Sequence, residues 1–293
     1  MNTTPFSGCL SRLLFALALL VLGACRSIEM VEPLQVMSFN VRVPVAADGP
    51  DRWELRRDLL VETIRGARPD VIGTQELVAG QGAYIVAHLP EYAWFGTGRR
   101  GAAGDASDEY MGVFWRRDTL RLLDSGDFWL SDTPEVAGSI SWDHLYPRLV
   151  TWGLFERIAD GRRFRLFNTH LPYRDEDGAA RLRGAELILQ RLAALPDAGP
   201  VILVGDFNDV PDSDVHRALL RTLDDAWLQA SRREGPAATF HAFTGQSERR
   251  IDWVLSRGLR AIRARTLTDN SAGRYPSDHF PVLVDFDWPE SPL

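Results

Sequence analysis

Six short clusters of carboxylate, amide and imidazole side chains lie at the ends of apolar segments of this sequence. In chain order they are Ser38-Phe39-Asn40, Gly73-Thr74-Gln75-Glu76, Asn168-Thr169-His170, Gly205-Asp206-Phe207-Asn208, Arg250-Ile251-Asp252 and Ser277-Asp278-His279. Polar groups at several strand ends converge on one edge of a layered fold, where binding pockets commonly lie. The sequence therefore predicts one polar pocket assembled from distant segments.

Each cluster has a simpler explanation when it is taken alone. An Asp or Asn after a strand, such as Asn40 or Asp206, commonly satisfies the backbone of its own turn. Glu76 alone could cap the following helix, and a single His is more often structural than catalytic. The interpretation as a reactive site rests on the occurrence of six such clusters in one chain.

The elements that must position these clusters are predicted from the apolar periodicity. Residues 53–67 and 178–195 have apolar residues at helical spacing, and the first of these helices ends before Pro69. Apolar or alternating runs predict strands at residues 34–39, 70–74, 111–115, 150–155, 164–169, 201–205, 251–255 and 281–286. Strands mixed with helices imply an α/β (α+β) fold with layered sheets. Periodicity alone leaves the packing of the sheets open.

The ordered clusters resemble those of the endonuclease/exonuclease/phosphatase superfamily, which includes deoxyribonuclease I, exonuclease III-type repair enzymes, inositol polyphosphate 5-phosphatases and bacterial sphingomyelinases. The most specific motifs are the fourth and sixth clusters, supported by Gln75-Glu76, and the similarity covers about residues 34 to 287. Stretches such as Pro147-Arg148 fit a bacterial branch of unknown substrate. The resemblance implies a four-layer sandwich, with two central mixed β-sheets flanked by helices. It also implies metal-dependent hydrolysis of phosphate esters.

The resemblance places a metal site at the first, second and last clusters. Glu76 is the best ligand, because hard carboxylate oxygens suit Mg²⁺ or Mn²⁺, which keep several waters and bind substrate phosphate. Asn40 resembles the family residue that completes this site. Asp278 either contributes to a metal site or orients the neighbouring His279. A bound ion would neutralise phosphate charge and stabilise the leaving oxygen.

The catalytic group implied by the resemblance has five members. Asp206 resembles the residue that orients or deprotonates the attacking water, and Asn208 would hold both Asp206 and the phosphate by hydrogen bonds. Asp252 and His279 look like an Asp-His pair, in which the carboxylate fixes the imidazole tautomer and raises its pKa. His279 then either takes a proton or stabilises the pentavalent state. His170 resembles a second family His that donates to a non-bridging oxygen.

Two further residues are expected to line the phosphate or substrate site. Glu109 matches by position the family carboxylate that pairs with the second His, here His170. Arg148 suits an oxyanion, because a planar guanidinium can bind two oxygens at once. A structural salt bridge is the alternative for Arg148.

The composition describes an acidic globular chain of 293 residues whose positive side chains are all arginine, with a net charge of −7. Such a protein lacks the broad positive field that draws polyanions to a surface, which disfavours long duplex DNA as a substrate. The negative net charge of the whole chain still allows a local cluster of arginines inside a cleft. We expect no stable nucleic-acid or protein partner, and we expect the protein to be a monomer.

The first 24 residues are predicted to be a secretory signal peptide. Arg12 precedes an apolar run from Leu13 to Leu22, which is short for a membrane span. The following Gly23-Ala24-Cys25 resembles a bacterial lipobox, which implies that Cys25 is lipidated and becomes the mature N-terminus. Cleavage near Ala24 without lipid, and an uncleaved anchor, are the alternatives.

Residues 25–33 would then form a lipidated N-terminus with a short tether, and residues 34–288 form one domain. Arg26 after the lipidated Cys favours the outer membrane. The domain is therefore expected to be exported and held to a bacterial membrane by lipid, on the periplasmic or the surface side.

Three substrate classes are possible for such an enzyme: nucleic acid, a phospholipid headgroup, and a small phosphorylated metabolite or sugar. The acidic charge disfavours nucleic acid, and no hydrophobic hairpin with exposed aromatics is evident, which disfavours a sphingomyelinase-like phospholipase. A small soluble ester is favoured, and both phosphodiesters and phosphomonoesters are left open. A non-catalytic surface binding lipoprotein on the same fold is the alternative of another class, and the intact polar set disfavours it.

Overall fold

A computed structural model describes residues 1, 3, 32–101, 106–197 and 199–288, and the chain divides into the units Met1–Glu32 and Pro33–Leu293. The predicted signal peptide apart from residues 1 and 3, Cys25 and most of the predicted tether lie outside the described residues. Every helix and strand named below belongs to the second unit. In the described part of the chain, no helix combines the length and apolar character needed to cross a membrane.

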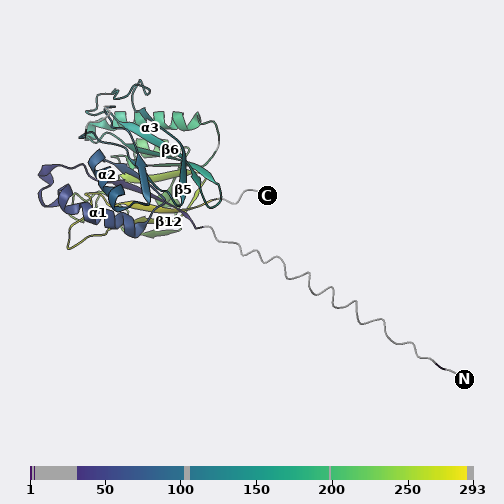
Figure 1. The fold of residues 1–293 in the computed structure, drawn as a ribbon. Coiled ribbons are helices and arrows are strands. Elements are labelled where there is room, and N and C mark those ends of the chain that lie inside the picture. Colours follow the sequence, from purple (N-terminus) through teal and green to yellow (C-terminus); the bar gives the residue numbers. More distant parts are fainter. Residues whose placement is uncertain (2, 4–31, 102–105, 198, 289–293) are drawn as a thin grey trace. The chain divides into compact units, whose positions relative to one another are not determined.

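Two mixed β-sheets form the centre of the second unit (Figure 1). Within the described residues, the first sheet has seven strands in the order β10 (Arg232–Glu234), β12 (Arg260–Thr266), β13 (Val282–Asp287), β1 (Leu34–Asn40), β2 (Val71–Gln75), β4 (Val113–Arg116) and β3 (Tyr92–Phe95). The second has six strands over the same ranges, in the order β5 (Leu120–Trp129), β6 (Leu149–Arg157), β7 (Arg163–His170), β8 (Val201–Asp206), β11 (Asp252–Arg257) and β9 (Asp224–Asp225).

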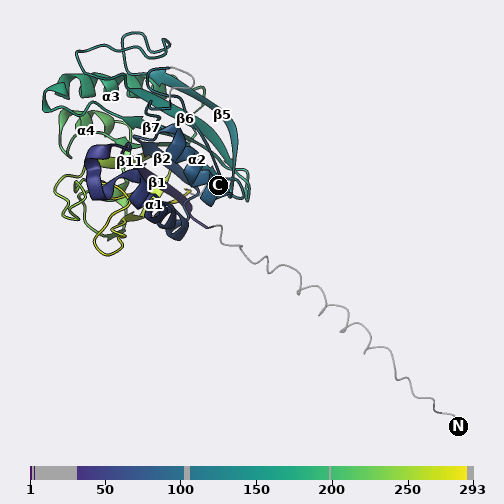
Figure 2. The same cartoon turned by 60° about the vertical axis from the view of Figure 1, so that its left-hand side comes forward.

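Helices cover the outer face of each sheet and produce four layers (Figures 1 and 2). α1 (Trp53–Ala67) and α2 (Ala79–His88) pack on the first sheet, and α3 (Gly178–Ala193) and α4 (Asp214–Leu219) pack on the second. Three short helical segments complete the unit: η1 (Ala46–Asp51), η2 (Asp175–Asp177) and α5 (Ala226–Gln229). The expected four-layer sandwich of two mixed sheets flanked by helices is confirmed.

The two sheets pack face to face through an apolar core, and they approach closely at Gly73 of β2. A Cβ at this position would lie only 2.3 Å from Cγ2 of Val204 in β8, so a larger side chain would push the sheets apart. Beside it, Nδ2 of Asn168 in β7 donates to the carbonyl oxygen of Thr74 at 2.8 Å, and Oδ1 accepts from Gln75 Nε2 at 2.7 Å. Asn168 and Gln75, which the sequence grouped with the reactive clusters, thus join the two sheets.

The strand register brings the polar clusters to one edge of the sandwich. Asn40, the last residue of β1, lies opposite Gln75 of the parallel strand β2, next to Glu76. In the second sheet, His170 of β7 and Asp252 of β11 lie opposite Asp206 at the end of β8, one on each side. Residues far apart in the sequence therefore meet around Asp206.

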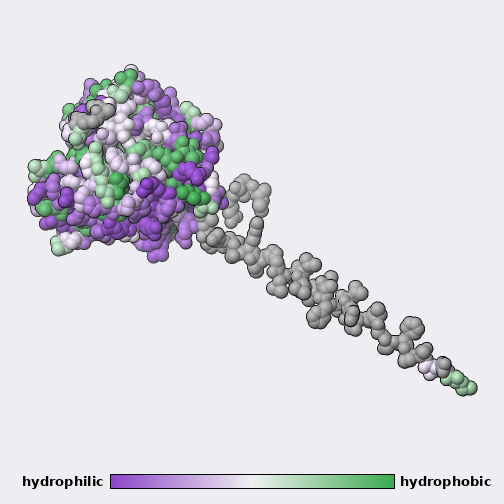
Figure 3. Space-filling view, viewed as in Figure 1, coloured by the Kyte–Doolittle hydropathy of each residue, from purple (hydrophilic) through white to green (hydrophobic). Residues whose placement is uncertain are grey.

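The surface of the second unit is mostly hydrophilic on the face drawn in Figure 3, with apolar residues in small patches. Exposed apolar side chains such as Leu123, Ile158 and Leu228 come from different elements of the fold. Single exposed apolar residues are common in soluble proteins and call for no partner.

Candidate active site

A pocket of about 450 Å³ opens at the edge where the polar clusters meet. Eight of the residues predicted from the sequence line it, namely Glu76, Glu109, Arg148, His170, Asp206, Asn208, Asp278 and His279. Asn40 and Asp252 lie directly behind this lining, where Asn40 bonds to Glu76 and Asp252 bonds to His279. The predicted single polar pocket is therefore present.

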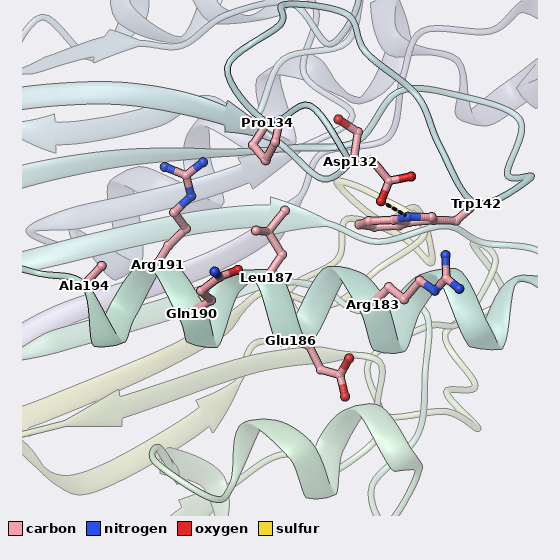
Figure 4. Close-up of a pocket in the computed structure, with 10 residues that line it drawn as sticks. Asp132, Pro134, Trp142, Arg183, Glu186, Leu187, Gln190, Arg191 and Ala194 are labelled. Carbon is pink, nitrogen blue, oxygen red and sulfur yellow. Dashed lines mark hydrogen bonds between the residues drawn. The ribbon is translucent and has the colours of Figure 1, made fainter.

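A larger hollow of about 660 Å³ lies between α3 and the loop after β5 (Figure 4). Its lining includes Trp142, whose indole Nε1 donates to Asp132 Oδ1 at 2.8 Å, with Arg183 and Glu186 on α3. None of the six polar clusters reaches this hollow. The pocket of about 450 Å³ is the candidate active site, because the residues of the polar clusters line it.

Asp206 is the centre of the hydrogen-bond network and is only 1% exposed. Its Oδ1 accepts from the Asn208 N–H at 2.9 Å, and its Oδ2 accepts from Asn40 Nδ2 at 3.0 Å. Asn208 itself has a left-handed backbone conformation (φ 50°). Burial, with the nearby charge of Asp252, raises the pKa of Asp206 to about 7. Asp206 can therefore gain and lose a proton near neutral pH.

Glu76 is the second carboxylate of the pocket, and Asn40 joins it to Asp206. Nδ2 of Asn40 donates to Glu76 Oε1 at 3.0 Å, while Oδ1 of Asn40 accepts from the Arg42 N–H at 3.0 Å. Burial by itself raises the pKa of Glu76, but the hydrogen bonds from the Val43 N–H and from Asn40 outweigh burial and hold that pKa below its usual range. The Glu76 side chain is thus a negatively charged carboxylate that can bind a metal cation.

The donor set beside Glu76 fits a divalent metal ion. One ligand atom each from Glu76, His170 and Asp206 lie within 4.8 Å of one another, and so do atoms of Asp206, Asp252 and His279. In the second group the ring nitrogen of His279 nearest Asp252 is already hydrogen-bonded to it. The first group offers two carboxylates in the pocket, which suits Mg²⁺ or Mn²⁺.

His279 and Asp252 form the predicted pair. Nδ1 of His279 is 2.9 Å from Asp252 Oδ2, and Nε2 points towards Asp206 Oδ2 at 3.9 Å. Burial alone would lower the pKa of His279, but the negative charges of Asp252 and Asp206 outweigh it and hold that pKa well above its ordinary value. The imidazole is therefore a cation facing the pocket.

His170 has the opposite character. Burial, together with the charges of Arg148 and Arg99, lowers the pKa of His170 well below its ordinary value. Nδ2 of Asn208 donates to the Leu171 carbonyl oxygen at 3.0 Å, which fixes the orientation of the amide, and the same Nδ2 lies 2.9 Å from His170 Nε2. His170 Nε2 is thus an acceptor, and the neutral ring carries its proton on the buried Nδ1. The expected donation from His170 to a non-bridging phosphate oxygen does not fit this arrangement, because neither ring nitrogen presents a proton to the pocket.

The expected pairing of Glu109 with His170 is wrong. Both oxygens of Glu109 bind Arg99, at 2.9 Å to Nη1 and 2.7 Å to Nη2, and the buried Nδ1 of His170 has no hydrogen-bond partner in the described structure. The reason is chemical: a neutral imidazole offers a carboxylate one donor, whereas a guanidinium offers a charged pair of donors. Glu109 still lines the pocket, as the counter-ion of Arg99.

Arg148 is buried in the pocket wall without a counter-ion. It is 3% exposed, its Nε and Nη1 have no hydrogen-bond partner, and its guanidinium forms no ion pair with any described residue. Burial, and then the neighbouring charge of Arg99, lower the pKa of Arg148 to about 10. The alternative of a structural salt bridge finds no acid within the described residues. A buried charge of this kind is costly unless an anion joins it.

Three arginines that line the pocket, Arg42, Arg99 and the exposed Arg249, were not expected from the sequence. With Arg148 they form a local arginine cluster in the cleft. All positive residues of the chain are arginine, and no motif sets these three apart from the rest. Asp278, predicted to bind metal or orient His279, has its Oδ2 3.7 Å from Arg42 Nε.

Arg56, which is fully buried in α1, joins the first and last clusters of the site. Its Nη1 donates to the carbonyl oxygens of Val41 and Pro276, both at 2.8 Å, and its Nη2 donates to that of Arg42 at 2.7 Å. These bonds hold the backbone just after Asn40 and just before Asp278.

Replacing Arg56 by Met should lower the free energy of unfolding by about 3 kcal/mol, because the carbonyl groups of Val41 and Pro276 lose a buried charged donor and that of Arg42 loses one of its two donors. Urea unfolding followed by circular dichroism measures this. Arg65→Met, on the exposed side of the same helix, is the control and should change stability by less than about 0.5 kcal/mol. Equal unfolding free energies for the two variants would contradict the assigned role of Arg56.

The comparisons with known proteins agree with this geometry. The Endonuclease/Exonuclease/phosphatase family matches residues 37–279. A solved structure described as a mannosyl-6-phosphatase of Bacteroides thetaiotaomicron VPI-5482 is 31% identical with a TM-score of 0.81, and the match covers 87% of this chain and 100% of that one. A family protein from Bacteroides thetaiotaomicron is 32% identical with a TM-score of 0.81, over 87% and 98% of the two chains. Nocturnin of Rattus norvegicus is 25% identical, over 89% of this chain and 67% of its own length.

Proposed function

This chain belongs to the endonuclease/exonuclease/phosphatase family, whose members hydrolyse phosphoester bonds, and we propose that it is a divalent-metal-dependent phosphoesterase acting on a small soluble ester. The observation that carries the proposal is the buried, unpaired guanidinium of Arg148 in a pocket with the joined carboxylates Glu76 and Asp206. A cation beside the carboxylates and a phosphate beside the guanidinium would together complete the charge balance of the pocket.

In the proposed reaction, Asp206 orients the attacking water and accepts its proton while the water oxygen bonds to phosphorus and the ester oxygen leaves. A bound Mg²⁺ or Mn²⁺ would neutralise phosphate charge and stabilise the leaving oxygen. The cationic His279 donates from Nε2 to a phosphate oxygen and stabilises the charge of the pentavalent state. Asn208 holds Asp206 through its N–H, and Asn40 fixes the spacing between Glu76 and Asp206.

The rim of the pocket favours a small substrate. Tyr146 and Tyr173 line the opening and are 36% and 50% exposed, and Tyr146 packs one face on Arg99 with 4.3 Å from its ring centre to the guanidinium carbon. Aromatic faces of this kind suit the ring of a sugar or another compact alcohol. The 31% identity to a protein described as a mannosyl-6-phosphatase supports the same substrate size. We propose a phosphorylated sugar or similar metabolite, ahead of nucleic acid or phospholipid.

A panel of phosphate esters tests the proposal directly. Residues 26–293 would be assayed with Mg²⁺ or Mn²⁺ on sugar phosphates, nucleotides, phospholipids, oligonucleotides and bis-p-nitrophenyl phosphate, and then with EDTA. We expect hydrolysis that EDTA removes and metal restores, with sugar phosphates preferred. No hydrolysis with any metal, together with no metal binding by calorimetry, would contradict the enzyme and favour a binding protein.

Replacing Arg148 by Met should weaken phosphate binding and stabilise the protein at the same time. Loss of the guanidinium removes a phosphate ligand, so the inhibition constant of inorganic phosphate should rise by about 10- to 100-fold, since a charged hydrogen bond contributes about 1.5–3 kcal/mol. Removing an unpaired buried charge should raise the free energy of unfolding by about 1 kcal/mol. Inhibition assays and thermal unfolding measure the two effects. A fall in stability with unchanged phosphate inhibition would show a structural role instead.

We also propose that the chain is exported and anchored by lipid at Cys25, for which the sequence Leu22-Gly23-Ala24-Cys25 is the support. Labelling of cells with a radioactive fatty acid should mark the wild-type chain and leave Cys25→Ser unmarked. Equal labelling of both chains, or none of either, would contradict the proposed anchor.

A further inference from the structure

Arg42 lies among three carboxylates beside the candidate metal site. Its guanidinium binds Asp48 through hydrogen bonds of 3.1 Å from Nε to Oδ2 and 2.8 Å from Nη2 to Oδ1. Nε is also 3.7 Å from Asp278 Oδ2, and Nη1 is 4.0 Å from Glu76 Oε2. Two of the residues expected to bind metal, Glu76 and Asp278, are therefore both within ion-pair distance of one arginine.

The direction of this side chain is fixed by the backbone of Arg42. The residue has a left-handed conformation (φ 56°), which is unfavourable outside glycine and persists where contacts enforce it. Its N–H donates to Asn40 Oδ1 at 3.0 Å, and its carbonyl oxygen accepts from Arg56 Nη2 at 2.7 Å and from Gln81 Nε2 at 3.0 Å. The fold thus holds a positive charge at this point.

Carboxylate oxygens are the ligands that hard divalent cations prefer. If Arg42 were absent, Asp48, Glu76 and Asp278 would therefore suit a divalent cation. A guanidinium neutralises the same oxygens and repels a second positive ion. We infer that Arg42 takes the place of a second divalent cation, so that the centre holds one ion, on the side of Glu76 and Asp206. Asp278 then pairs with Arg42 instead of binding metal. The inference rests on the proposed function, because it assumes an ion at Glu76.

Titration of the purified, metal-free protein with Mn²⁺ tests this inference without substrate. Calorimetry gives the number of ions per chain, and electron paramagnetic resonance separates isolated ions from spin-coupled pairs. We expect one isolated Mn²⁺ on the wild type. Arg42→Met, which keeps the bulk and removes the charge, should bind two coupled ions. Adding Asp278→Asn to Arg42→Met should return the number to one.

Two matched variants separate the charge of Arg42 from its shape and from the other arginines. Arg42→Lys keeps one positive charge and should bind one ion. Arg249→Met removes an exposed arginine that lines the same pocket, and it should also bind one ion.

The possible outcomes distinguish the inference from the proposed function. Two ions on the wild type would overturn the inference and leave the metal-dependent function standing. One ion of unchanged affinity on Arg42→Met, with a normal circular dichroism spectrum and melting temperature, would also overturn it. No ion on the wild type would remove the metal-dependent function together with the inference. Two ions or no ion on the wild type would overturn the inference without any variant, and the circular dichroism spectrum and melting temperature show whether Arg42→Met is folded.

Discussion

Asp206→Asn should lower kcat for phosphate-ester hydrolysis by about 10³-fold, because the pocket loses the group that accepts the proton of the attacking water. The amide keeps the shape of the carboxylate, but it is not a base at neutral pH. The wild-type rate should rise with pH as Asp206 loses its proton, at or below about pH 7, since a bound cation lowers the pKa of about 7 that burial and Asp252 give this carboxyl. In the variant this rise should vanish. Initial rates from pH 5 to 9 with Mn²⁺ measure both effects.

Asp285→Asn is the matched control for this variant. Asp285 is also a buried carboxylate, at 8% exposed, but it bonds to Gln35 and Arg265 on β1 and β12, away from the pocket. Its replacement should change stability and leave kcat within about twofold of the wild type. If Asp206→Asn kept a near-normal rate with the same pH profile, another group would be the base.

The strand-end residues could be predicted from sequence because the strands that carry them are regular and apolar. The run over β8 is apolar enough to be buried on both faces, and its end at Asp206 was expected within one residue. α1 was predicted with its observed bounds from the helical spacing of Leu55, Leu59, Leu60 and Ile64 before Pro69, although Leu55 is exposed in the structure. Once these elements are placed, the register of parallel neighbours brings His170 next to Asp206.

Other elements escaped prediction because their sequences are atypical of their structure. β12 has the sequence Arg-Ala-Ile-Arg-Ala-Arg-Thr, and β5 contains two Asp residues and a Gly, as suits an edge strand with one solvated face. α2 contains Gly80 and Gly82, which weaken helix propensity. Gly82 is needed there because a Cβ would lie 2.5 Å from the ring of Trp94.

The pairing of charged side chains could not be predicted from the sequence either, and Glu109 is the clearest example. The position of Glu109 in the family pattern indicated His170 as its partner. The actual partner depends on which positive side chain the loop before β4 places near Glu109, and that side chain is Arg99. The same holds for Arg42, whose contact with Asp278 joins residues from opposite ends of the domain. Charged pairs between loops follow from tertiary geometry and leave no periodic signal.

Replacing His279 by Gln should lower kcat by about 10²- to 10³-fold, and Asp252→Asn should lower it by a similar factor, because the pair acts as one cationic donor. Asp252 holds the pKa of His279 well above its ordinary value, so the wild-type rate should stay high as pH rises and fall only at alkaline pH, where the imidazole loses its proton. Asp252→Asn removes that stabilisation of the charged form. The alkaline fall should therefore move to lower pH in this variant.

The double variant Asp252→Asn/His279→Gln should be no slower than His279→Gln, because a residue that acts through His279 has no further effect once His279 is gone. The buried pair of His216 and Asp225 gives the matched control. His216 Nε2 lies 2.9 Å from Asp225 Oδ2, outside the pocket, and its ring packs edge-on to Trp253. His216→Gln should lower the melting temperature and leave kcat and its pH profile unchanged. Additive losses from the Asp252 and His279 substitutions would mean that Asp252 acts on the reaction independently of the imidazole and that the two residues do not act as one donor.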